Sequence, residues 1–444
     1  MSRLVTDAIL RVMKKIITRF APSPTGFLHI GGVRTALFSY LFARQNKGEF
    51  ILRVEDTDKA RNKDEWIKAI VDDLGWLGLK HDIYAQQSAR VALHTKYLQK
   101  LIDGGYAYVS KEVPKEEGQR SEVIRFKNPN KKIVFNDLIR GQVEMDPTDL
   151  GDFIIARSID DPLYHLAVVV DDIDMGVTHI IRAEEHISNT PRQIMIMEAL
   201  GASRPIYAHL PLILATDKSK LSKRKHGESV SLTYYRNKGY LPEAIINFVA
   251  LMGWNPGTEQ EIFSLDELIS LFKIEKVQKA GAVFNVEKLN WFNRQYLDRM
   301  DLNTFVEKAG DFIPKGTLPQ IATLIKEKIS FFGEIPEILK NEFAFINPLS
   351  PYDTDKLRGK SDDPKTHIKK VIELISTLSE KDFTKEKIKE VIWPYAEEKG
   401  RGNVLWPTRY ALTGQDKSPD PFISAEILGK TESIKRLSTA HDSI

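Results

Sequence analysis

The chain has 444 residues, of which 42% are hydrophobic and 28% charged, and its formal net charge is only +3. This length leaves room for about two to four domains. The small net charge excludes a strongly basic overall surface, so a nucleic-acid partner would have to be bound by local basic patches. The absence of cysteine excludes disulfides and thiolate metal sites, and no apolar run approaches the roughly 20 residues that cross a bilayer.

The N-terminal part of the chain alternates between strands and helices. Residues 1–14 are weakly amphipathic and lack a small-residue cleavage site, so we expect an N-terminal extension and no secretory signal. Strands are predicted over Ile16–Phe20 and Phe50–Glu55, followed by amphipathic helices over Val33–Asn46 and Asp64–Leu77. This alternation predicts an α/β fold with a parallel sheet, whose ligands lie at the carboxyl ends of the strands.

Two loops of unusual composition lie far apart in the sequence. The first follows the first strand, is rich in turn residues, and ends in His29, Gly31 and Gly32 at the start of a helix. Glycine lets the backbone approach a nucleotide closely, and a helix N-terminus favours anions. The second carries five cations between Lys218 and Lys225. Alone, each is typical of an ordinary solvated loop, but together they predict two loops that close over a polyphosphate.

The rest of the chain changes character twice. Across residues 106–166 the pattern is irregular, with short strands such as Val123–Phe126 and Phe153–Ala156. From Leu232 onward it is almost wholly helical, and the polar segment Arg358–Pro364 is predicted to be a linker. The expected architecture is therefore an α/β nucleotide-binding N-terminal half that contains an irregular segment with short strands, followed by an all-α C-terminal half.

Several further segments resemble a known family. They are Thr18–Gly26, Phe50–Asp58, Tyr164–Asp172, Thr178–Glu185 and Gly402–Pro407. With the two loops, they resemble the class I aminoacyl-tRNA synthetases, and in particular the bacterial glutamyl-tRNA synthetases, in the same order over roughly residues 15–435. The general class I loop ends in a second histidine, where this chain has Gly32, a change common among glutamate-specific members.

The resemblance implies an order of domains. A Rossmann-like catalytic domain would span 15–105 and 167–225, and an inserted α+β domain over 106–166 that binds the acceptor stem would interrupt it. A stem-contact domain would follow over 226–300, and a helical anticodon-binding region over 301–444. Many relatives carry a cysteine-rich zinc knuckle in the insertion. This chain has no cysteine and only about fifteen residues, 110–123, at that place, so we expect a shortened insertion without zinc. Glutaminyl enzymes end in β-barrels, so the helical half favours glutamate.

The resemblance also implies how ATP is bound. His29, Lys220 and Lys223 would be catalytic and, with Gly31 and Gly32, would bind ATP. Magnesium would be held through the ATP phosphates, because phosphoryl and nucleotidyl transfer depend mainly on positioning and charge stabilisation.

A glutamate pocket needs a cation for the side-chain carboxylate and an anion for the ammonium group, and the planar fork of arginine suits the first role. By resemblance, Arg19 and Arg182 bind the carboxylate, Tyr164 and Ser23 add polar contacts, and Glu55 holds the ammonium. Taken alone, either arginine could be a structural ion-pair partner, and Glu55 could cap a turn. The pair Asp171–Asp172 is interpreted as a helix cap or a salt-bridged turn, and no metal ligand is assigned.

The function implied is that of an enzyme that activates L-glutamate with ATP and transfers it to the 3′ end of tRNA(Glu). Three alternatives stay open: an enzyme that also charges tRNA(Gln), a paralogue that glutamylates a tRNA base, and an RNA-binding module without catalysis. The first alternative is favoured by the lysines of Leu324–Ile329, where the family often has Arg-Pro-Arg, because lysine lacks arginine's fork. A cytoplasmic monomer without a membrane partner is expected.

Overall fold

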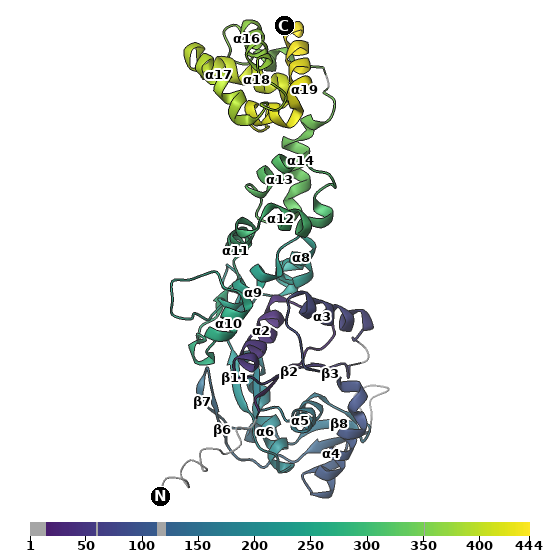
Figure 1. Ribbon diagram of the computed structural model, residues 1–444. Helices are drawn as coiled ribbons and strands as arrows, with labels where there is room; N and C mark the ends of the chain where they lie inside the picture. The colour runs from purple at the N-terminus through teal and green to yellow at the C-terminus, as the bar shows by residue number, and fades with distance from the viewer. Residues whose placement is uncertain (1–14, 59–60, 113–120, 350) are drawn as a thin grey trace, which may run out of the picture. The chain divides into compact units, whose positions relative to one another are not determined.

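The computed structural model describes residues 15–58, 61–112, 121–349 and 351–444, and divides into two compact units, Met1–Tyr296 and Leu297–Ile444 (Figure 1). The division falls inside helix α11 (Val286–Arg299), near the predicted boundary at 300/301. The predicted extension 1–14 and much of the expected knuckle position, 113–120, lie outside the described residues. The domain boundaries implied by the family remain predictions.

A seven-stranded sheet forms the centre of the first unit, in the order β3-β2-β1-β10-β11-β6-β7. Every neighbouring pair is parallel except β6 and β7. The strands are β1 (Ile17–Phe20), β2 (Glu49–Val54), β3 (Ile83–Gln86), β6 (Ile133–Asp137), β7 (Gly141–Met145), β10 (His179–Ala183) and β11 (Ile206–Leu210). The strand order reverses between β1 and β10, which is where doubly wound sheets bind their ligands. The predicted Rossmann-like sheet is confirmed.

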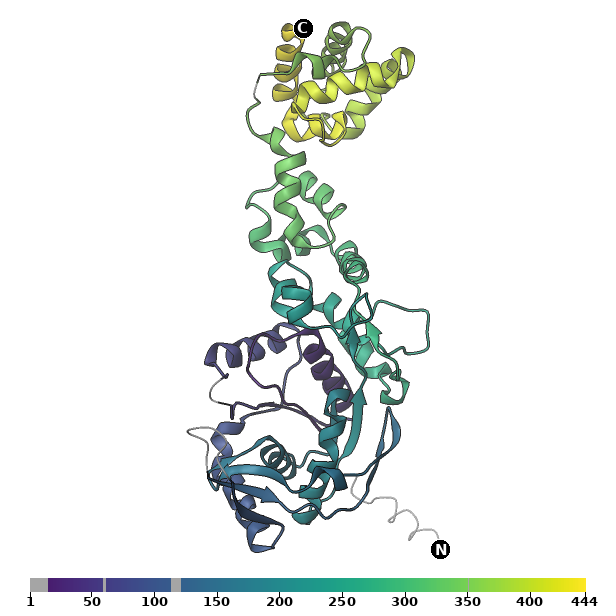
Figure 2. The ribbon, with the colours of Figure 1, turned by 180° about the vertical axis from the view of Figure 1, so that it is seen from behind.

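Helices cover both faces of this sheet (Figures 1 and 2). Phe50 of β2 contacts Tyr40 of helix α2 (Ile30–Gln45), with ring centroids 5.6 Å apart. The next residue, Ile51, points the other way because side chains alternate along a strand, and it joins a buried cluster on the opposite face. That cluster includes residues of α4 (Val91–Asp103), α5 (Tyr164–Asp174) and α6 (Thr190–Ala199).

The segment predicted to be an insertion contributes to two sheets. Four of its strands form a separate antiparallel sheet in the order β4-β5-β8-β9. These strands are β4 (Ala107–Lys111), β5 (Glu122–Phe126), β8 (Phe153–Ser158) and β9 (Asp161–Pro162). The hairpin β6–β7 leaves that sheet and extends the central one through the pairing of β6 with β11.

The first unit also contains two short strands and several further helices, most of which follow β11 in the chain. Strands β12 (Ile213–Leu214) and β13 (Ala282–Val283) pair in parallel. The helices are α3 (Asp64–Trp76), between β2 and β3, and then α7 (Lys223–His226), α8 (Leu232–Asn237), α9 (Pro242–Ala250), α10 (Leu265–Leu271) and the greater part of α11. None of the helices within the described ranges combines the length and the apolar character that a membrane span requires.

The second unit is built from helices, as predicted. They are α12 (Leu302–Ala309), α13 (Pro319–Lys326), α14 (Ile335–Glu342), α15 (Thr354–Arg358), α16 (Pro364–Ser376), α17 (Lys385–Lys399), α18 (Arg401–Thr413) and α19 (Pro421–Ser443). The prediction that Arg358–Pro364 is a linker is wrong. Leu357 before it and Ile368 after it are fully buried in one hydrophobic cluster, so the polar residues between them form a surface turn, with Gly359 at φ 54°.

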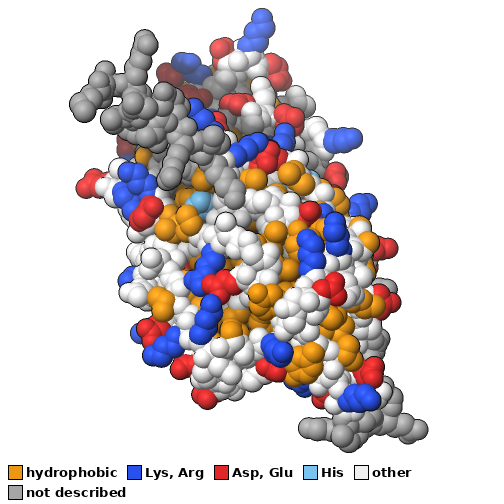
Figure 3. Space-filling model, turned by 90° about the horizontal axis from the view of Figure 1, so that it is seen from below, with side chains coloured by type: hydrophobic (Ala, Val, Ile, Leu, Met, Phe, Trp, Pro, Cys, Tyr) orange, Lys and Arg blue, Asp and Glu red, His pale blue; other side chains and the backbone are white. Residues whose placement is uncertain are grey.

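The surface seen in Figure 3 is electrostatically mixed. Cationic, anionic and hydrophobic side chains are interspersed across this face, in keeping with a net charge of +3. On this face, a partner recognised by charge would therefore have to bind at a local cluster of like charges.

Candidate active site

Strands β1 and β10, which flank the reversal of strand order, each carry a buried arginine near the carboxyl end. Arg19 of β1 is in register with Ile51 of β2, and Arg182 of β10 is in register with His209 of β11. Because Ile51 faces the cluster formed by α4, α5 and α6, Arg19 projects from the same face of the sheet. The fold thus gathers these arginines at the expected end of the sheet.

Arg182 is a buried cation without an ionic partner. It is only 5% exposed, and no carboxylate of the described residues lies within ion-pair distance of its guanidinium. Neutral acceptors hold it instead: Nε donates to His209 Nε2 at 3.1 Å, Nη1 to Gln193 Oε1 at 2.8 Å, and Nη2 to Thr190 Oγ1 at 2.9 Å. Burial lowers the pKa of Arg182. Such a group favours the arrival of an anion.

Arg19 belongs to a buried ion-pair network. Its Nε donates to Asp172 Oδ1 at 3.1 Å, and Arg53 Nη1 donates to the same oxygen at 2.7 Å. Arg53 Nη2 in turn donates to Glu55 Oε1 at 3.1 Å. Burial raises the pKa of Glu55, and Arg53 and Arg19 oppose that shift. Glu55 and Arg19 are therefore linked through Arg53 and Asp172.

Tyr164, the first residue of α5, lies among these charges. Burial and the Glu55 carboxylate raise the pKa of its phenol, while Arg182 and Arg19 lower it. Its hydroxyl is 3.4 Å from His186 Nδ1. The structure thus brings together four of the five residues predicted for the glutamate pocket. Ser23 is different: it is exposed on the loop after β1, and its carbonyl accepts from Thr25 N at 2.9 Å.

Asp171 and Asp172 form ion pairs as expected, but the interpretation of their position as a helix cap or a turn is wrong. Both residues lie inside α5 and are fully buried. Asp171 accepts from Arg90 Nε at 2.7 Å and lies 2.8 Å from His94 Nε2. Burial acts to raise the pKa of Asp172, but Arg19 and Arg53 outweigh it and hold this pKa below its usual range. The two aspartates are counter-ions for cations that the sheet projects toward α5.

His29 forms the N-cap of helix α2. Its Nδ1 accepts a hydrogen bond from the backbone N–H of Gly32 at 3.1 Å, so the neutral ring carries its proton on Nε2. A Cβ at Gly31 would lie 3.0 Å from the His29 ring, and one at Gly32 would lie 2.7 Å from Leu28 Cδ1. Both glycines therefore give this cap the room it needs.

The residues that follow the cationic loop contact the end of the first loop. Leu232 N donates to Leu28 O at 2.8 Å, and His29 forms a β-bridge with Ser231. Lys220 is ion-paired with Glu185. One side of His29 is open to solvent, yet desolvation by the surrounding protein lowers its pKa, Glu185 raises it and Lys220 lowers it again. His29 and Lys220 thus share one electrostatic environment.

Lys223 is held within its own loop. It lies on helix α7, is exposed, and its Nζ is 3.0 Å from Glu228 Oε1. In this arrangement it is paired locally, so a role at the phosphates requires that the loop closes and exchanges this partner.

Comparison with known families and structures shows the family to which the chain belongs. The family model "tRNA synthetases class I (E and Q), catalytic domain" matches residues 15–122 and 111–291, and "Anticodon binding domain" matches residues 291–441. The chain belongs to the class I tRNA synthetases of the E and Q type.

Several curated proteins similar to this chain are named glutamate–tRNA ligase. The one from Carboxydothermus hydrogenoformans is 38% identical, over 94% of this chain and 98% of its own. The one from Aquifex aeolicus is 39% identical, over 96% and 98%. A crystal structure of a glutamate tRNA ligase from Elizabethkingia meningosepticum, in complex with its amino acid, superposes with a TM-score of 0.86 at 34% identity, covering 96% of this chain and 99% of that one.

Sequence reasoning missed three residues of this synthetase site. Arg53 lies within a segment that carries the family resemblance, but its isolated charge does not reveal that it is buried. His209 contacts Arg182 directly, and Asp137 lies behind it, with His209 Nδ1 only 2.6 Å from Asp137 Oδ2. Their one sequence signal is that each is a polar residue in a short apolar strand.

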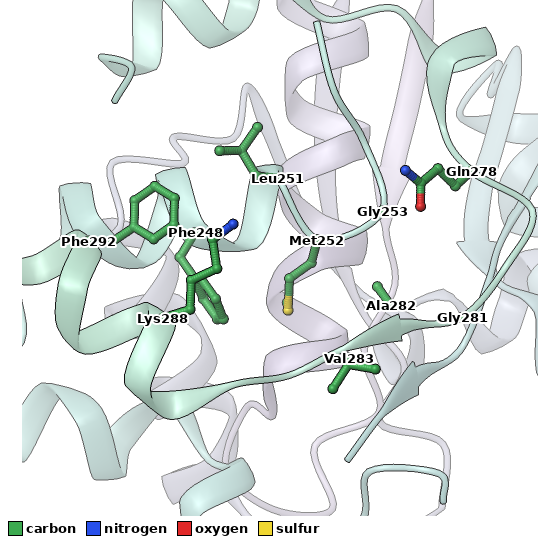
Figure 4. Close-up of a pocket in the computed structure, with 10 residues that line it drawn as sticks. All are labelled: Phe248, Leu251, Met252, Gly253, Gln278, Gly281, Ala282, Val283, Lys288 and Phe292. Carbon is green, nitrogen blue, oxygen red and sulfur yellow. The ribbon is translucent and has the colours of Figure 1, made fainter. Parts of the chain in front are cut away.

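A separate cavity of about 250 Å³ lies beside α9, α11 and β13 (Figure 4). Figure 4 shows the side chains of Lys288, on α11, and of Met252, just after α9, among those that line this cavity. Its lining consists of Phe248, Leu251, Met252, Gly253, Gln278, Gly281, Ala282, Val283, Lys288 and Phe292. This lining includes none of the predicted site residues, so the cavity is distinct from the candidate active site.

Proposed function

We propose that this synthetase is an ATP-dependent ligase that joins L-glutamate to the 3′ end of tRNA(Glu). The observation that carries the proposal is the buried guanidinium of Arg182, whose acceptors among the described residues are all neutral, beside Arg19, Tyr164 and Glu55. A substrate with a side-chain carboxylate and an ammonium group complements this charge distribution. The relatives named as glutamate–tRNA ligases support the same conclusion.

Within this proposal, the glutamate side-chain carboxylate binds Arg182, with Arg19 and Tyr164 adding a second cation and a hydroxyl. Glu55 accepts from the ammonium group, and Ser23 contributes a polar contact from its loop. Arg19 already shares its charge with Asp172, whereas Arg182 does not, so Arg182 supplies the larger part of the selection for a charged side chain.

ATP binds where the two loops meet. The Nε2–H of His29 donates to a phosphate oxygen, and the backbone around Gly31 and Gly32 accommodates the nucleotide. Lys220 and Lys223 exchange Glu185 and Glu228 for phosphate oxygens as the loop closes. Magnesium enters with ATP, bound through its phosphates.

The reaction has two steps. The α-carboxylate of glutamate attacks the α-phosphorus of ATP, and pyrophosphate leaves as the glutamyl-adenylate forms. A terminal ribose hydroxyl of the tRNA then attacks the carbonyl carbon of this mixed anhydride, forming the ester and releasing AMP and a proton. The protein contributes mainly positioning and stabilisation of charge.

The second unit reads the anticodon end of the tRNA in this proposal, supported by the anticodon-binding family match over residues 291–441. The antiparallel sheet β4-β5-β8-β9 contacts the acceptor stem, and residues 226–300 contact the stem below it. Charging of tRNA(Gln) in addition to tRNA(Glu) is part of the proposal, based on Lys326 and Lys328.

The test is a charging assay with the purified full chain. Radiolabelled glutamate, ATP and tRNA(Glu) should give acid-precipitable glutamyl-tRNA, and glutamine in place of glutamate should give none. Charging with glutamine, or no charging with either amino acid, would refute the proposed substrate.

A further inference from the structure

Three polar side chains from three neighbouring strands lie in line across the central sheet. Asp137 is the last residue of β6, His209 is on β11, and Arg182 is on β10. Asp137 Oδ2 lies 2.6 Å from His209 Nδ1, and Arg182 Nε lies 3.1 Å from His209 Nε2. All three side chains are buried.

The direction of these hydrogen bonds follows from the donors. Arginine can only donate, so His209 Nε2 must present its lone pair to Arg182. Thr190 Oγ1 lies 3.3 Å from the same nitrogen and can also donate to it. The proton of the neutral ring is then on Nδ1, where the Asp137 carboxylate accepts it. Burial, the main influence, lowers the pKa of His209, although Asp137 acts to raise it.

This arrangement fixes Arg182 without neutralising it. Were Asp137 to contact Arg182 directly, the ion pair would offset the charge that a substrate carboxylate needs. Instead, the Asp137 carboxylate selects one tautomer and one ring position of His209, and the ring in turn fixes the orientation of the Arg182 guanidinium.

We propose that Asp137 and His209 are positioning residues that orient Arg182 and thereby set the preference for glutamate over glutamine. This inference rests on the proposed function, because it takes Arg182 as the ligand of the glutamate side chain. A purely structural role, in which Asp137 only ties β6 to β11, predicts a loss of stability without a change in substrate preference.

Asp137→Asn tests the tautomer, because the orientation of the new amide is determined by its neighbours. Asp137 Oδ1 accepts from Ile139 N and Arg140 N, both at 2.9 Å, and Oδ2 accepts from His209 N at 3.0 Å. The amide oxygen therefore stays toward the first two donors, since the reverse orientation would oppose both. The amide NH₂ then faces His209 Nδ1 and forces the proton onto Nε2, against the N–H of Arg182.

The first measurement is ¹⁵N NMR of histidine-labelled full chain, with the His209 signals assigned by their loss in His209→Gln. The wild type should show a protonated Nδ1 and an unprotonated Nε2, and Asp137→Asn should show the reverse. A protonated Nε2 in the wild type would overturn the proposal.

The second measurement is steady-state charging with glutamate. Asp137→Asn should raise the KM for glutamate about tenfold to a hundredfold, as expected when a bond to a charged group is lost, and leave the KM for ATP unchanged. The preference for glutamate over glutamine should fall with it. His209→Gln places an amide oxygen near the position of Nε2 and should retain most of the preference for glutamate over glutamine. Adding Asp137→Asn to His209→Gln should raise the KM for glutamate much less than Asp137→Asn does in the wild type.

Matched controls separate positioning from folding. His179→Gln changes a buried histidine at the other end of β10, and Asp146→Asn changes an aspartate that caps a backbone N–H after β7. Neither should change the KM for glutamate. If Asp137→Asn does not fold, His209→Gln and His209→Met carry the test, because only glutamine keeps the acceptor.

The outcomes are distinguishable. A wild type that charges no tRNA with glutamate would overturn the proposed function and the positioning role with it. A wild type that charges normally, with an unchanged KM in Asp137→Asn or equal KM values in His209→Gln and His209→Met, would overturn the positioning role alone.

Discussion

Arg53 Nη1 lies 2.7 Å from Asp172 Oδ1, and both side chains are buried almost completely. Asp172 also accepts from Arg19, and the other end of the Arg53 guanidinium binds Glu55. One residue that contacts no substrate in our proposal therefore connects the group assigned to the glutamate ammonium with a group assigned to its carboxylate.

Removing Arg53 should destabilise the first unit strongly. Arg53→Met leaves Asp172 and Glu55 buried with one cation fewer, and loss of one partner in such a network typically costs about 3–5 kcal/mol of unfolding free energy. Urea unfolding followed by circular dichroism measures this. Arg157→Met, at an exposed pair with Asp161, is the control and should change the midpoint little. Equal effects of the two variants would contradict the importance of the buried network.

Lys223→Ala should lower the rate of charging far more than it weakens glutamate binding. Its cation is needed when charge builds on the α-phosphate, and one such contact is typically worth about 2.7–4 kcal/mol, or roughly a hundred- to a thousandfold in rate. Single-turnover charging gives the rate constant. Lys132→Ala, an exposed lysine paired with Glu144 on the β6–β7 hairpin, is the matched control. A normal rate constant in Lys223→Ala would remove this residue from the mechanism.

Arg182→Ala should reduce kcat/KM for glutamate by about tenfold to a hundredfold, because a hydrogen bond to a charged group is worth roughly 1.5–3 kcal/mol. Arg19→Ala should act in the same direction but less, since Asp172 already shares its charge. The ratio of kcat/KM for glutamate to that for glutamine is the measurement. Both variants retaining the wild-type ratio would mean that the pocket lies elsewhere.

Acidification should destabilise the first unit through His165. Burial, aided by Arg192 and Arg182, lowers the pKa of His165 from 6.5 to about 4. Below pH 6.5 the unfolded chain therefore binds a proton that the folded protein does not, so stability falls as the pH decreases toward 4. The thermal midpoint should drop between pH 7 and pH 5, and drop less in His165→Gln. An identical drop in both proteins would contradict this assignment.

The intact chain should charge tRNA(Gln) as well as tRNA(Glu). Lys326 and Lys328 stand where the family often has arginines, and Lys328 is ion-paired with Glu342. A point charge discriminates less sharply than a planar fork. Charging both tRNAs with glutamate tests this, and Lys326→Arg with Lys328→Arg should reduce tRNA(Gln) charging more than tRNA(Glu) charging. Strict selectivity in the wild type would refute the prediction.

The sequence predicted the first two strands of the central sheet, β1 and β2, because the apolar pattern of each is local. The helix predicted over Val33–Asn46 begins earlier, at Ile30, because the capping group is the imidazole of His29, and histidine is not among the usual N-cap residues. The linker prediction failed for a related reason: the polarity of Arg358–Pro364 is local, whereas the shared burial of Leu357 and Ile368 is not.

Within the candidate site, local motifs led to the residues proposed to bind the substrates, but they did not indicate which other residues hold those side chains in place. Arg19 and Asp172 are 153 positions apart, and Asp137 and His209 are 72 apart. A partner at such a distance leaves no periodicity or spacing in the sequence. It becomes visible only when the register of β1, β10, β11 and β6 is known.

Strand β6 lies in the segment predicted to be an insertion but pairs with β11 in the central sheet, which limits how this protein can be re-engineered by exchanging modules. A chimaera that takes residues 106–166 from a relative would also replace Asp137, and with it the group behind His209. An exchange confined to β4, β5, β8 and β9 would leave that carboxylate in its native strand. The safe crossover points therefore flank the β6–β7 hairpin on either side, at 127–132 and 146–152, so that the separate antiparallel sheet can be exchanged while the proposed glutamate pocket stays native.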